Sequence, residues 1–551
     1  MPSKSKASIS DAERNHTYDG SGTEEDPFIV EFHKDDPGNP MNWSQFRKWW
    51  ITTIVTFSVF AVTFTSSAYS VSAEKVLQDF DISTEMFTLG LSLFVLGFAI
   101  GPAFWGPLYI RRHALSLLLL TGPRSELYGR QPLWIITHIA MVAFLGGSAG
   151  SHNIATLLIL RFFAGTFGGS PLVNSGGTIA DIFPPAQRGL ALTIYCVAPF
   201  LGPILGPIIG GFVSQSVGWR WVQGLCTIFI GVVGILGVIF VSETYGPVLL
   251  QRRATKLAQT DGKVYVSVLE KNQGKKKPSE IFERALFRPW IFLFLEPIVL
   301  IASLYMAIIY GTVYMFMGAM PIVYNEQRGW SAGIGGLSFL GIMVGIILGL
   351  VYAIWDNNAR YTRLFKKSMA TTRLPPDAEA RLPPAIIGGI ALPIGMFAFA
   401  WTNSPTIHWS VSIILSVPFG FGCVLVILPI MNYLIDSYTL YAASVLAAAA
   451  IFRSIIGAVF PLFTAQMYHS LGIHWASSVP AFLTLLCALF PAFMWRYGKA
   501  VRLKCKYSAE ATEMFRNMLL QQAGAATGVV FREYETEGNG EEEEGKASRS
   551  Q

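Results

Sequence analysis

Apolar runs long enough to cross a lipid bilayer recur along most of the chain and are separated by polar segments. A helix rises about 1.5 Å per residue, so about 20 apolar residues span the hydrocarbon core of a bilayer. Backbone polar groups inside lipid must be paired within the protein, which forces such runs to be helical. The pattern predicts twelve transmembrane helices, at 49–70, 86–107, 132–150, 154–178, 189–213, 221–241, 289–316, 335–354, 384–402, 409–434, 440–464 and 475–495.

The longest polar interruption lies between the sixth and seventh runs, at 243–287, and divides the chain into two halves. We therefore expect an all-α membrane protein with two six-helix bundles, at 46–242 and 288–497. Residues 1–45 and 498–551 are polar and carry no clear helical or strand period, which indicates disordered cytoplasmic tails. Within the central loop, Leu249 to Leu257 have near-helical apolar spacing beside basic residues, which predicts a surface helix on the inner leaflet.

Composition and charge support this reading and orient the chain. Of the 551 residues, 52% are hydrophobic and only 14% are charged, too few to coat a soluble particle of this size. Segments predicted outside contain only Lys75, Arg220 and Arg328 as cations, whereas the other loops are rich in Lys and Arg. The positive-inside rule therefore predicts that both termini are cytoplasmic. We expect the protein in the cell membrane. The net charge of +6 is modest and dispersed over loops, which argues against a nucleic-acid partner.

The fifth run contains an unusual concentration of glycine and proline, in the stretch APFLGPILGPIIGGF that begins at Ala198. Glycines at every fourth position leave one helix face without side chains, so another helix can pack closely there. Prolines remove backbone donors and bend the helix. The residues concerned are Gly202, Gly206, Pro207, Gly210 and Gly211. A tightly packed helix without a special role is the simpler interpretation of the same pattern.

This glycine-proline pattern on a fifth span resembles the fifth-helix signature of proton-coupled antiporters in the major facilitator superfamily. The junction from Asp36 to Ser44, DPGNPMNWS, resembles the start of the fungal drug:proton antiporter family, in its twelve-span polyamine and multidrug exporter branch. The similarity extends over about 36–506. It implies the major facilitator fold, a substrate cavity between the halves near the midplane, and a fifth helix that acts as a hinge at their interface.

The same resemblance implies a cytoplasmic latch between the second and third spans, where an acid and an arginine hold neighbouring helices. Its residues here are Gly106, Glu126, Gly129 and Arg130, but the motif is interrupted by residues 109–124. Removing those sixteen residues restores an uninterrupted motif. Two hypotheses follow: the insertion is a loop on the inner leaflet, or it is absent from the working protein. We favour the second hypothesis, in which the deduced sequence contains a segment that the working protein lacks, for example a retained short intron. If the protein does contain the insertion, the latch formed by Glu126 and Arg130 is in doubt.

Ionisable residues inside a bilayer are costly and therefore are functional candidates. Arg161 matches an arginine that the resemblance associates with proton coupling, and there it would hold a nearby carboxylate or carbonyl cluster. An arginine that snorkels to the interface or caps a helix is the alternative. Glu296 precedes Pro297, which weakens the helix there, so it is a candidate proton carrier or a carboxylate near the inner interface. Asp181 and Asp436 end the fourth and tenth spans at equivalent places, and we expect them to pair with basic loop residues.

The candidate substrate cavity is lined by polar and aromatic residues of the second half. Its predicted members are Tyr310, Tyr314, Asn432 and Arg453, of which Arg453 could equally have a structural partner. Acidic and amide residues that the resemblance leads us to expect are replaced by apolar ones near Gly318 and Ala449. A cavity poor in acids suits an amphipathic organic molecule better than a polycation.

These observations predict a monomeric, proton-coupled efflux transporter that exports a drug, a toxin or a secondary metabolite. Protons, lipid and a small molecule are its expected partners. We expect no cofactor and no metal, because the proton gradient supplies the energy for transport. A membrane enzyme is disfavoured because His138, the only histidine well inside a span, has no Cys or acid at ligand spacing. The alternatives are a polyamine transporter, an uptake permease, or an inactive product of an interrupted gene.

Overall fold

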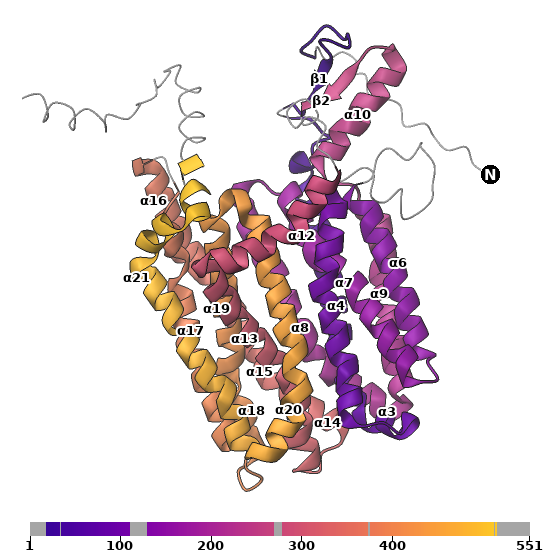
Figure 1. Cartoon of the computed structure of the whole chain (residues 1–551), viewed down its shortest axis with the longest axis vertical. Coiled ribbons are helices and arrows are strands. Elements are labelled where there is room, and N and C mark those ends of the chain that lie inside the picture. Colours follow the sequence, from indigo (N-terminus) through magenta and orange to yellow (C-terminus); the bar gives the residue numbers. More distant parts are fainter. Residues whose placement is uncertain are drawn as a thin grey trace, which may run out of the picture.

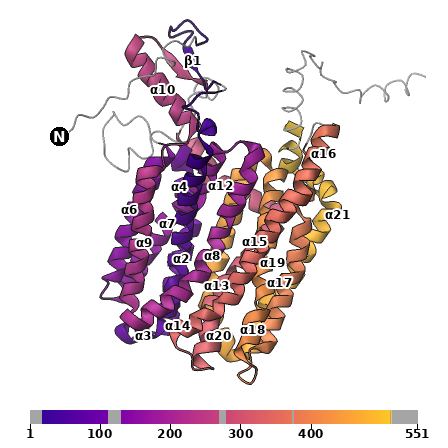
Figure 2. The same cartoon turned by 180° about the vertical axis from the view of Figure 1, so that it is seen from behind.

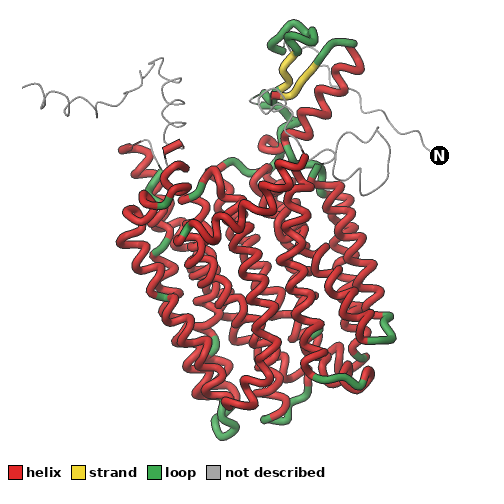
Figure 3. Tube along the Cα trace, viewed as in Figure 1, coloured by secondary structure: helices red, strands yellow, loops and turns green. Residues whose placement is uncertain are grey.

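The computed structural model describes residues 18–33, 35–110, 129–268, 278–372, 375–511 and 513–514. Nearly all of the described chain is helical, and the long helices run roughly side by side (Figures 1 and 3). We call the end of the bundle at which the first long helix begins the tail side. The crossing helices of the first half are α2 (Gln45–Ala68), α4 (Thr84–Ile110), α6 (Arg130–Ala149), α7 (Ile154–Ile182), α8 (Pro185–Val217) and α9 (Trp219–Phe240), with the short η2 (Ser70–Ser72) and α3 (Ala73–Phe80) after α2.

The second half repeats this arrangement with more breaks in its helices. Its crossing segments are α13 (Pro297–Met320) with η3 (Pro321–Glu326), α14 (Ala332–Gly336) with η4 (Leu337–Phe339) and α15 (Leu340–Asp356), α17 (Pro383–Thr402), α18 (Trp409–Leu415) with α19 (Val417–Ser437), α20 (Ala442–Cys487) and α21 (Leu489–Lys504). On the tail side, η5 (Asn357–Tyr361), α16 (Thr362–Thr372), η6 (Ala378–Arg381) and η7 (Thr439–Tyr441) complete this half.

Eleven helical segments of the described chain are long and apolar enough to cross a membrane, and the last of them contains two crossings. That segment covers Ala442–Lys504, and its backbone leaves helical geometry at Gly472, where φ is 73°. The chain reverses there, and Tyr468 and Ser477 on either side of the reversal are joined by a hydrogen bond of 2.8 Å. The described residues therefore make twelve crossings, in agreement with the sequence prediction.

The crossings form two bundles, with the helices of the first half on one side and those of the second half on the other (Figure 2). Equivalent helices of the two bundles make equivalent pairs. In the first bundle α2 packs on α8, α4 on α7 and α6 on α9. In the second, α13 packs on α20, α15 on α19 and α17 on α20 and α21. The bundles meet where α4 packs on α20 and where α8 packs on α14 and α15.

The seventh crossing starts later than the sequence pattern predicted. Residues 289–295 belong to α12 (Pro278–Leu295), a separate helix that runs obliquely over the tail side in Figure 1. Glu296 has extended backbone geometry, and α13 begins at Pro297. The residue before a proline is disfavoured in the helical region, so a continuous apolar run is divided at this point.

A small structured unit on the tail side corrects two expectations. Strand β1 (Phe28–Val30) pairs in parallel with β2 (Tyr265–Ser267), and both lie beside α10 (Gly246–Asp261). The tail before the first span is therefore ordered over much of its described part, where η1 (Pro40–Asn42) also lies. The apolar face of α10, formed by Leu250, Ala254 and Leu257, packs on β1 rather than on the lipid surface that the sequence suggested.

Candidate transport site and latches

Gly202, Gly206 and Gly210 of α8 form a glycine stripe that lies against α2 of the same bundle. A Cβ added to Gly202 would lie 2.0 Å from the Thr63 hydroxyl, and one added to Gly206 would lie 2.1 Å from the Ser67 hydroxyl. Such distances are impossible for real atoms, so these positions require glycine for the helices to pack at this separation. The closest approach in the stripe is thus within one bundle, which differs from our expectation of a stripe between the two bundles.

The opposite bundle meets a second row of α8. A Cβ added to Gly211 would lie 2.5 Å from the carbonyl oxygen of Ala332, and one added to Gly336 would lie 2.6 Å from that of Pro207. In addition, the backbone N–H of Gly333 donates to the side chain of Gln215 over 3.3 Å. Helix α8 therefore joins α2 on one face and the start of the eighth crossing on another.

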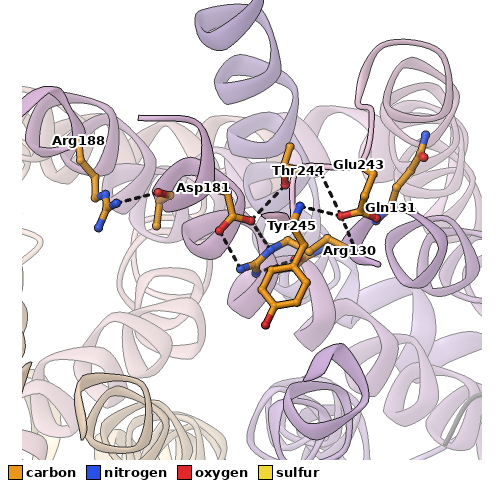
Figure 4. Close-up of polar contacts among 9 residues, drawn as sticks. Arg130, Gln131, Asp181, Arg188, Glu243, Thr244 and Tyr245 are labelled. Carbon is orange, nitrogen blue, oxygen red and sulfur yellow. Dashed lines mark hydrogen bonds and ion pairs between the residues drawn. The ribbon is translucent and has the colours of Figure 1, made fainter. Parts of the chain in front are cut away.

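The arginine of the predicted latch pairs with an aspartate on the neighbouring helix (Figure 4). Arg130 begins α6, and its Nε lies 2.6 Å from Oδ2 of Asp181 at the end of α7. The guanidinium also donates to Asn174 over 3.5 Å and lies 5.1 Å from the ring centre of Tyr245. Of the other latch residues, Gly106 lies within α4, whereas Glu126 and most of the insertion at 109–124 fall outside the described residues.

Glu243 is a latch residue that the sequence analysis missed. Its carboxylate accepts backbone N–H groups from Arg130 and Gln131 at the start of α6, and from Thr244 and Tyr245 in its own loop, over 2.9 to 3.2 Å. An acid at a helix N-terminus satisfies free donors and is favoured by the helix dipole. The signal available in the sequence was an acid directly after the sixth span, followed by Thr-Tyr-Gly-Pro.

The second bundle contains a corresponding arrangement. Arg381, just before α17, has its Nε 2.8 Å from Oδ2 of Asp436 at the end of α19. Glu379 pairs with Arg502 of α21 over 2.8 Å, and both side chains are nearly buried. In both bundles an arginine before or at the start of the third helix thus binds the aspartate that ends the fourth. The expected pairing of Asp181 and Asp436 with basic residues is what the structure shows.

Arg161 is completely buried in the first bundle and is bound by neutral groups. Its Nε donates to the carbonyl of Gly90 over 2.9 Å, and its two terminal nitrogens donate to Ser66 and Gln223 over 3.3 and 3.5 Å. The guanidinium also lies 4.0 Å from the ring centre of Tyr69. Of the two partner types that the sequence suggested, a carboxylate or a carbonyl cluster, the described residues provide the carbonyls.

Glu296 lies on the tail side, between α12 and α13, and is almost fully buried. It accepts the Tyr438 hydroxyl over 2.8 Å and the backbone N–H of Tyr507 over 3.0 Å. Burial, together with the nearby charge of Glu296, raises the pKa of the Cys505 thiol to about 11. Arg161 and Glu296 therefore occupy different bundles, and no described hydrogen bond or ion pair joins them.

Three of the four predicted cavity residues come together between the bundles. Tyr310 donates to Tyr314 over 3.4 Å, and the Tyr314 hydroxyl lies 2.7 Å from that of Ser66 on α2. The Arg453 guanidinium lies 4.9 Å from the ring centre of Tyr310. No described hydrogen bond or ring contact joins Asn432 to these residues. Ser66 was not anticipated, because small hydroxyl residues are frequent in membrane helices and give no distinct signal.

Two six-helix membrane bundles with paired tail-side latches and a polar cluster at their interface define a transporter of the two-bundle class. The sequence profile of the Major Facilitator Superfamily matches residues 55–461. The chain belongs to the major facilitator superfamily.

Similar proteins include transporters from several fungi. The chain is 78% identical over 95% of its length to the major facilitator-type transporter sorT of Penicillium rubens, of which it covers 97%. It is 55% identical over 93% of its length to the MFS-type efflux pump MFS2 of Trichophyton rubrum, of which it covers 82%. The fold is also that of the xylose transporter XylE from E. coli, with a TM-score of 0.57 and 17% identity over 82% of this chain and 98% of that one.

Proposed function

We propose that this transporter is a proton-coupled exporter of small amphipathic organic compounds from the cytoplasm across the cell membrane. The observation that carries the proposal is its similarity to a fungal efflux pump over 93% of the chain, with 55% identity. The aromatic and hydroxyl cluster of Ser66, Tyr310 and Tyr314 between the bundles supports an amphipathic cargo, because aromatic rings and a few polar groups are typical of small-molecule sites.

Alternating access by the two bundles is the proposed mechanism. The α8 helix contacts both bundles, so a change in its packing alters their relative position. The arginine–aspartate pairs hold each bundle together on the tail side while the contacts between bundles change. Arg161 and Glu296 are the proposed proton-coupling residues. The proposed orientation has both chain termini in the cytoplasm, because the positive-inside rule assigns basic loops to that side. A single chain is the proposed transport unit.

Inside-out membrane vesicles test the direction and the coupling. Their outer surface is the former cytoplasmic face, so an acidic lumen reproduces the physiological gradient. We expect radiolabelled naphthalene-1-sulfonate, naphthalene-1-sulfonamide or both to accumulate only when the lumen is acidic, and a protonophore to abolish accumulation. Accumulation driven by an alkaline lumen would indicate symport. The proposal would be contradicted if accumulation did not depend on the pH gradient across the vesicle membrane, or if neither probe was transported.

The insertion at 109–124 is tested with two versions of the chain. We propose that the working protein lacks this segment. Vesicles with the full chain and vesicles with a chain lacking residues 109–124 are compared at equal protein level. Transport by the shorter chain alone supports the hypothesis, whereas equal or better transport by the full chain contradicts it. Sequencing of transcripts from expressing cells shows independently which form is made.

A further inference from the structure

Arg453 is partly buried within the membrane region and differs from the fully buried Arg161 in that no described residue accepts a hydrogen bond from it. Its Nε is buried and has no hydrogen-bond partner among the described residues. Its guanidinium lies 4.9 Å from the ring centre of Tyr310. Arg161, by contrast, donates to three oxygen atoms of its own bundle. The first bundle therefore supplies acceptors to its buried arginine, whereas the described residues supply none to Arg453.

The position of Arg453 is at the interface of the bundles. It lies on α20 of the second bundle, the helix that packs on α4 of the first. One turn further along α20, a Cβ added to Gly457 would contact both Tyr310 and Val95 of α4. The guanidinium is therefore placed where a molecule held between the bundles would contact it.

An arginine among apolar and aromatic side chains selects for negative charge. The guanidinium is permanently ionised and offers planar N–H donors that match a carboxylate or a sulfonate. In a region of low dielectric constant its attraction for an anion is much stronger than in water. The described residues provide no acid as an ion-pair partner for Arg453.

We propose that Arg453 anchors the anionic group of the exported compound, so that the preferred cargo is an amphipathic organic acid. The apolar body of the cargo lies against aromatic residues, and the Tyr310 and Tyr314 hydroxyls bind its further polar groups. This inference rests on the proposed export function. A cargo without a negative charge would leave the guanidinium unpaired, which penalises its binding.

A pair of probes of nearly equal shape tests the inference. Naphthalene-1-sulfonate is an anion and naphthalene-1-sulfonamide is neutral near pH 7. Their uptake into inside-out vesicles with an acidic lumen is measured for the unmodified chain, for Arg453→Gln and for Arg453→Lys. We expect Arg453→Gln to lower sulfonate uptake by about tenfold or more and sulfonamide uptake by less than about twofold. Arg453→Lys keeps the charge and should restore part of the sulfonate uptake.

The outcomes separate the inference from the function. If the unmodified chain moves the sulfonamide but not the sulfonate, or if Arg453→Gln lowers both equally or neither, the anion site is wrong and export stands. If the unmodified chain moves neither probe, the proposed function itself fails. Membrane level and thermal unfolding of Arg453→Gln are measured in parallel. If that variant is unstable, the unmodified chain decides alone: it should move the sulfonate faster than the sulfonamide, and equal transport of the two probes would contradict the inference.

Discussion

The Nε of Arg130 lies 2.6 Å from Oδ2 of Asp181, and this pair joins the start of the third crossing to the end of the fourth. Arg381 and Asp436 make the corresponding pair in the other bundle. The same arginine–aspartate ion pair therefore occurs on the tail side of both bundles. Because each pair lies within a bundle, it stabilises the bundle as a unit that can move relative to its partner.

Arg130→Gln should destabilise the protein and lower transport. The two side chains are 18% and 19% exposed, so loss of the arginine leaves a largely buried carboxylate unpaired, at a cost of about 1–3 kcal/mol. The matched control is Arg220→Gln, which breaks a pair with Asp79 whose side chains are 45% and 41% exposed, and should cost about 0–1 kcal/mol. Thermal unfolding in detergent and vesicle uptake are the measurements.

The double variant Arg130→Gln with Asp181→Asn is the decisive companion. It removes both charges, so the penalty of an unpaired acid disappears and part of the stability should return. If the double variant is as unstable as the sum of the single changes, the two residues act independently and the latch interpretation is wrong.

The number of crossings was predictable because each depends on local composition alone. The bilayer requires an apolar helix of a certain length, and a sliding count of apolar residues detects it. Contacts between distant segments were not predictable in the same way. Strand β1 has only three residues, and its partner β2 lies more than 200 residues away, so neither segment carries a strand signal of its own.

The candidate site was partly visible in the sequence. Arg161 and Arg453 stood out because charges inside a membrane are rare, but nothing in the sequence told which of them the protein would satisfy. That distinction depends on carbonyl groups, such as those of Gly90 and Ser66, that every residue possesses. Glu243 was missed for a related reason, since its partners are backbone N–H groups.

Gly206→Ala should separate α8 from α2 and destabilise the first bundle. The new methyl group would lie 2.1 Å from the Ser67 hydroxyl and 2.8 Å from the backbone nitrogen of Ala68, so the helix must shift. We expect a loss of about 1–3 kcal/mol, as for other overpacked sites, and reduced uptake. Gly189→Ala is the control in the same helix, because a Cβ there meets nothing within 4 Å. An equal effect of both changes on thermal unfolding would show that helix flexibility, and not close packing, explains the stripe.

Asp36→Asn should release the ordered segment that precedes the first span. The Asp36 carboxylate binds Arg253 of α10, and both side chains are largely buried, so its loss should favour opening of the contact between β1 and β2 by about 1–3 kcal/mol. Hydrogen exchange of residues 28–30 measures this opening. Glu25→Gln, at an exposed position, is the control and should leave exchange unchanged.

The pH dependence of this contact follows from the Asp36 carboxyl. Burial raises its pKa, but the hydrogen bonds from Arg253 and Gly38 and the charge of Arg253 outweigh burial, so the pKa lies below its ordinary value of 3.8. A lowered pKa gives stability that is fully present above the ordinary value and is lost as the pH falls through the lowered one. Exchange at residues 28–30, corrected for its intrinsic pH dependence, should therefore be constant between about pH 5 and pH 8. Opening within that window would show that another group controls the contact.

Glu243→Gln should weaken the first bundle through the start of α6. The carboxylate accepts four backbone N–H groups, and a side-chain amide has one oxygen and adds donors of its own, so several of these bonds are lost. We expect a loss of about 1–3 kcal/mol in the free energy of unfolding and lower uptake.

Gly129→Ala provides an independent probe of the same contact. Gly129 has a φ of −140°, which alanine adopts freely, but a Cβ at this position would overlap the Glu243 carboxylate. If the acid acts by capping α6, both single changes should have similar effects on thermal unfolding and the double variant should be little worse than either. Fully additive effects would show that Glu243 stabilises the bundle by some means other than this cap.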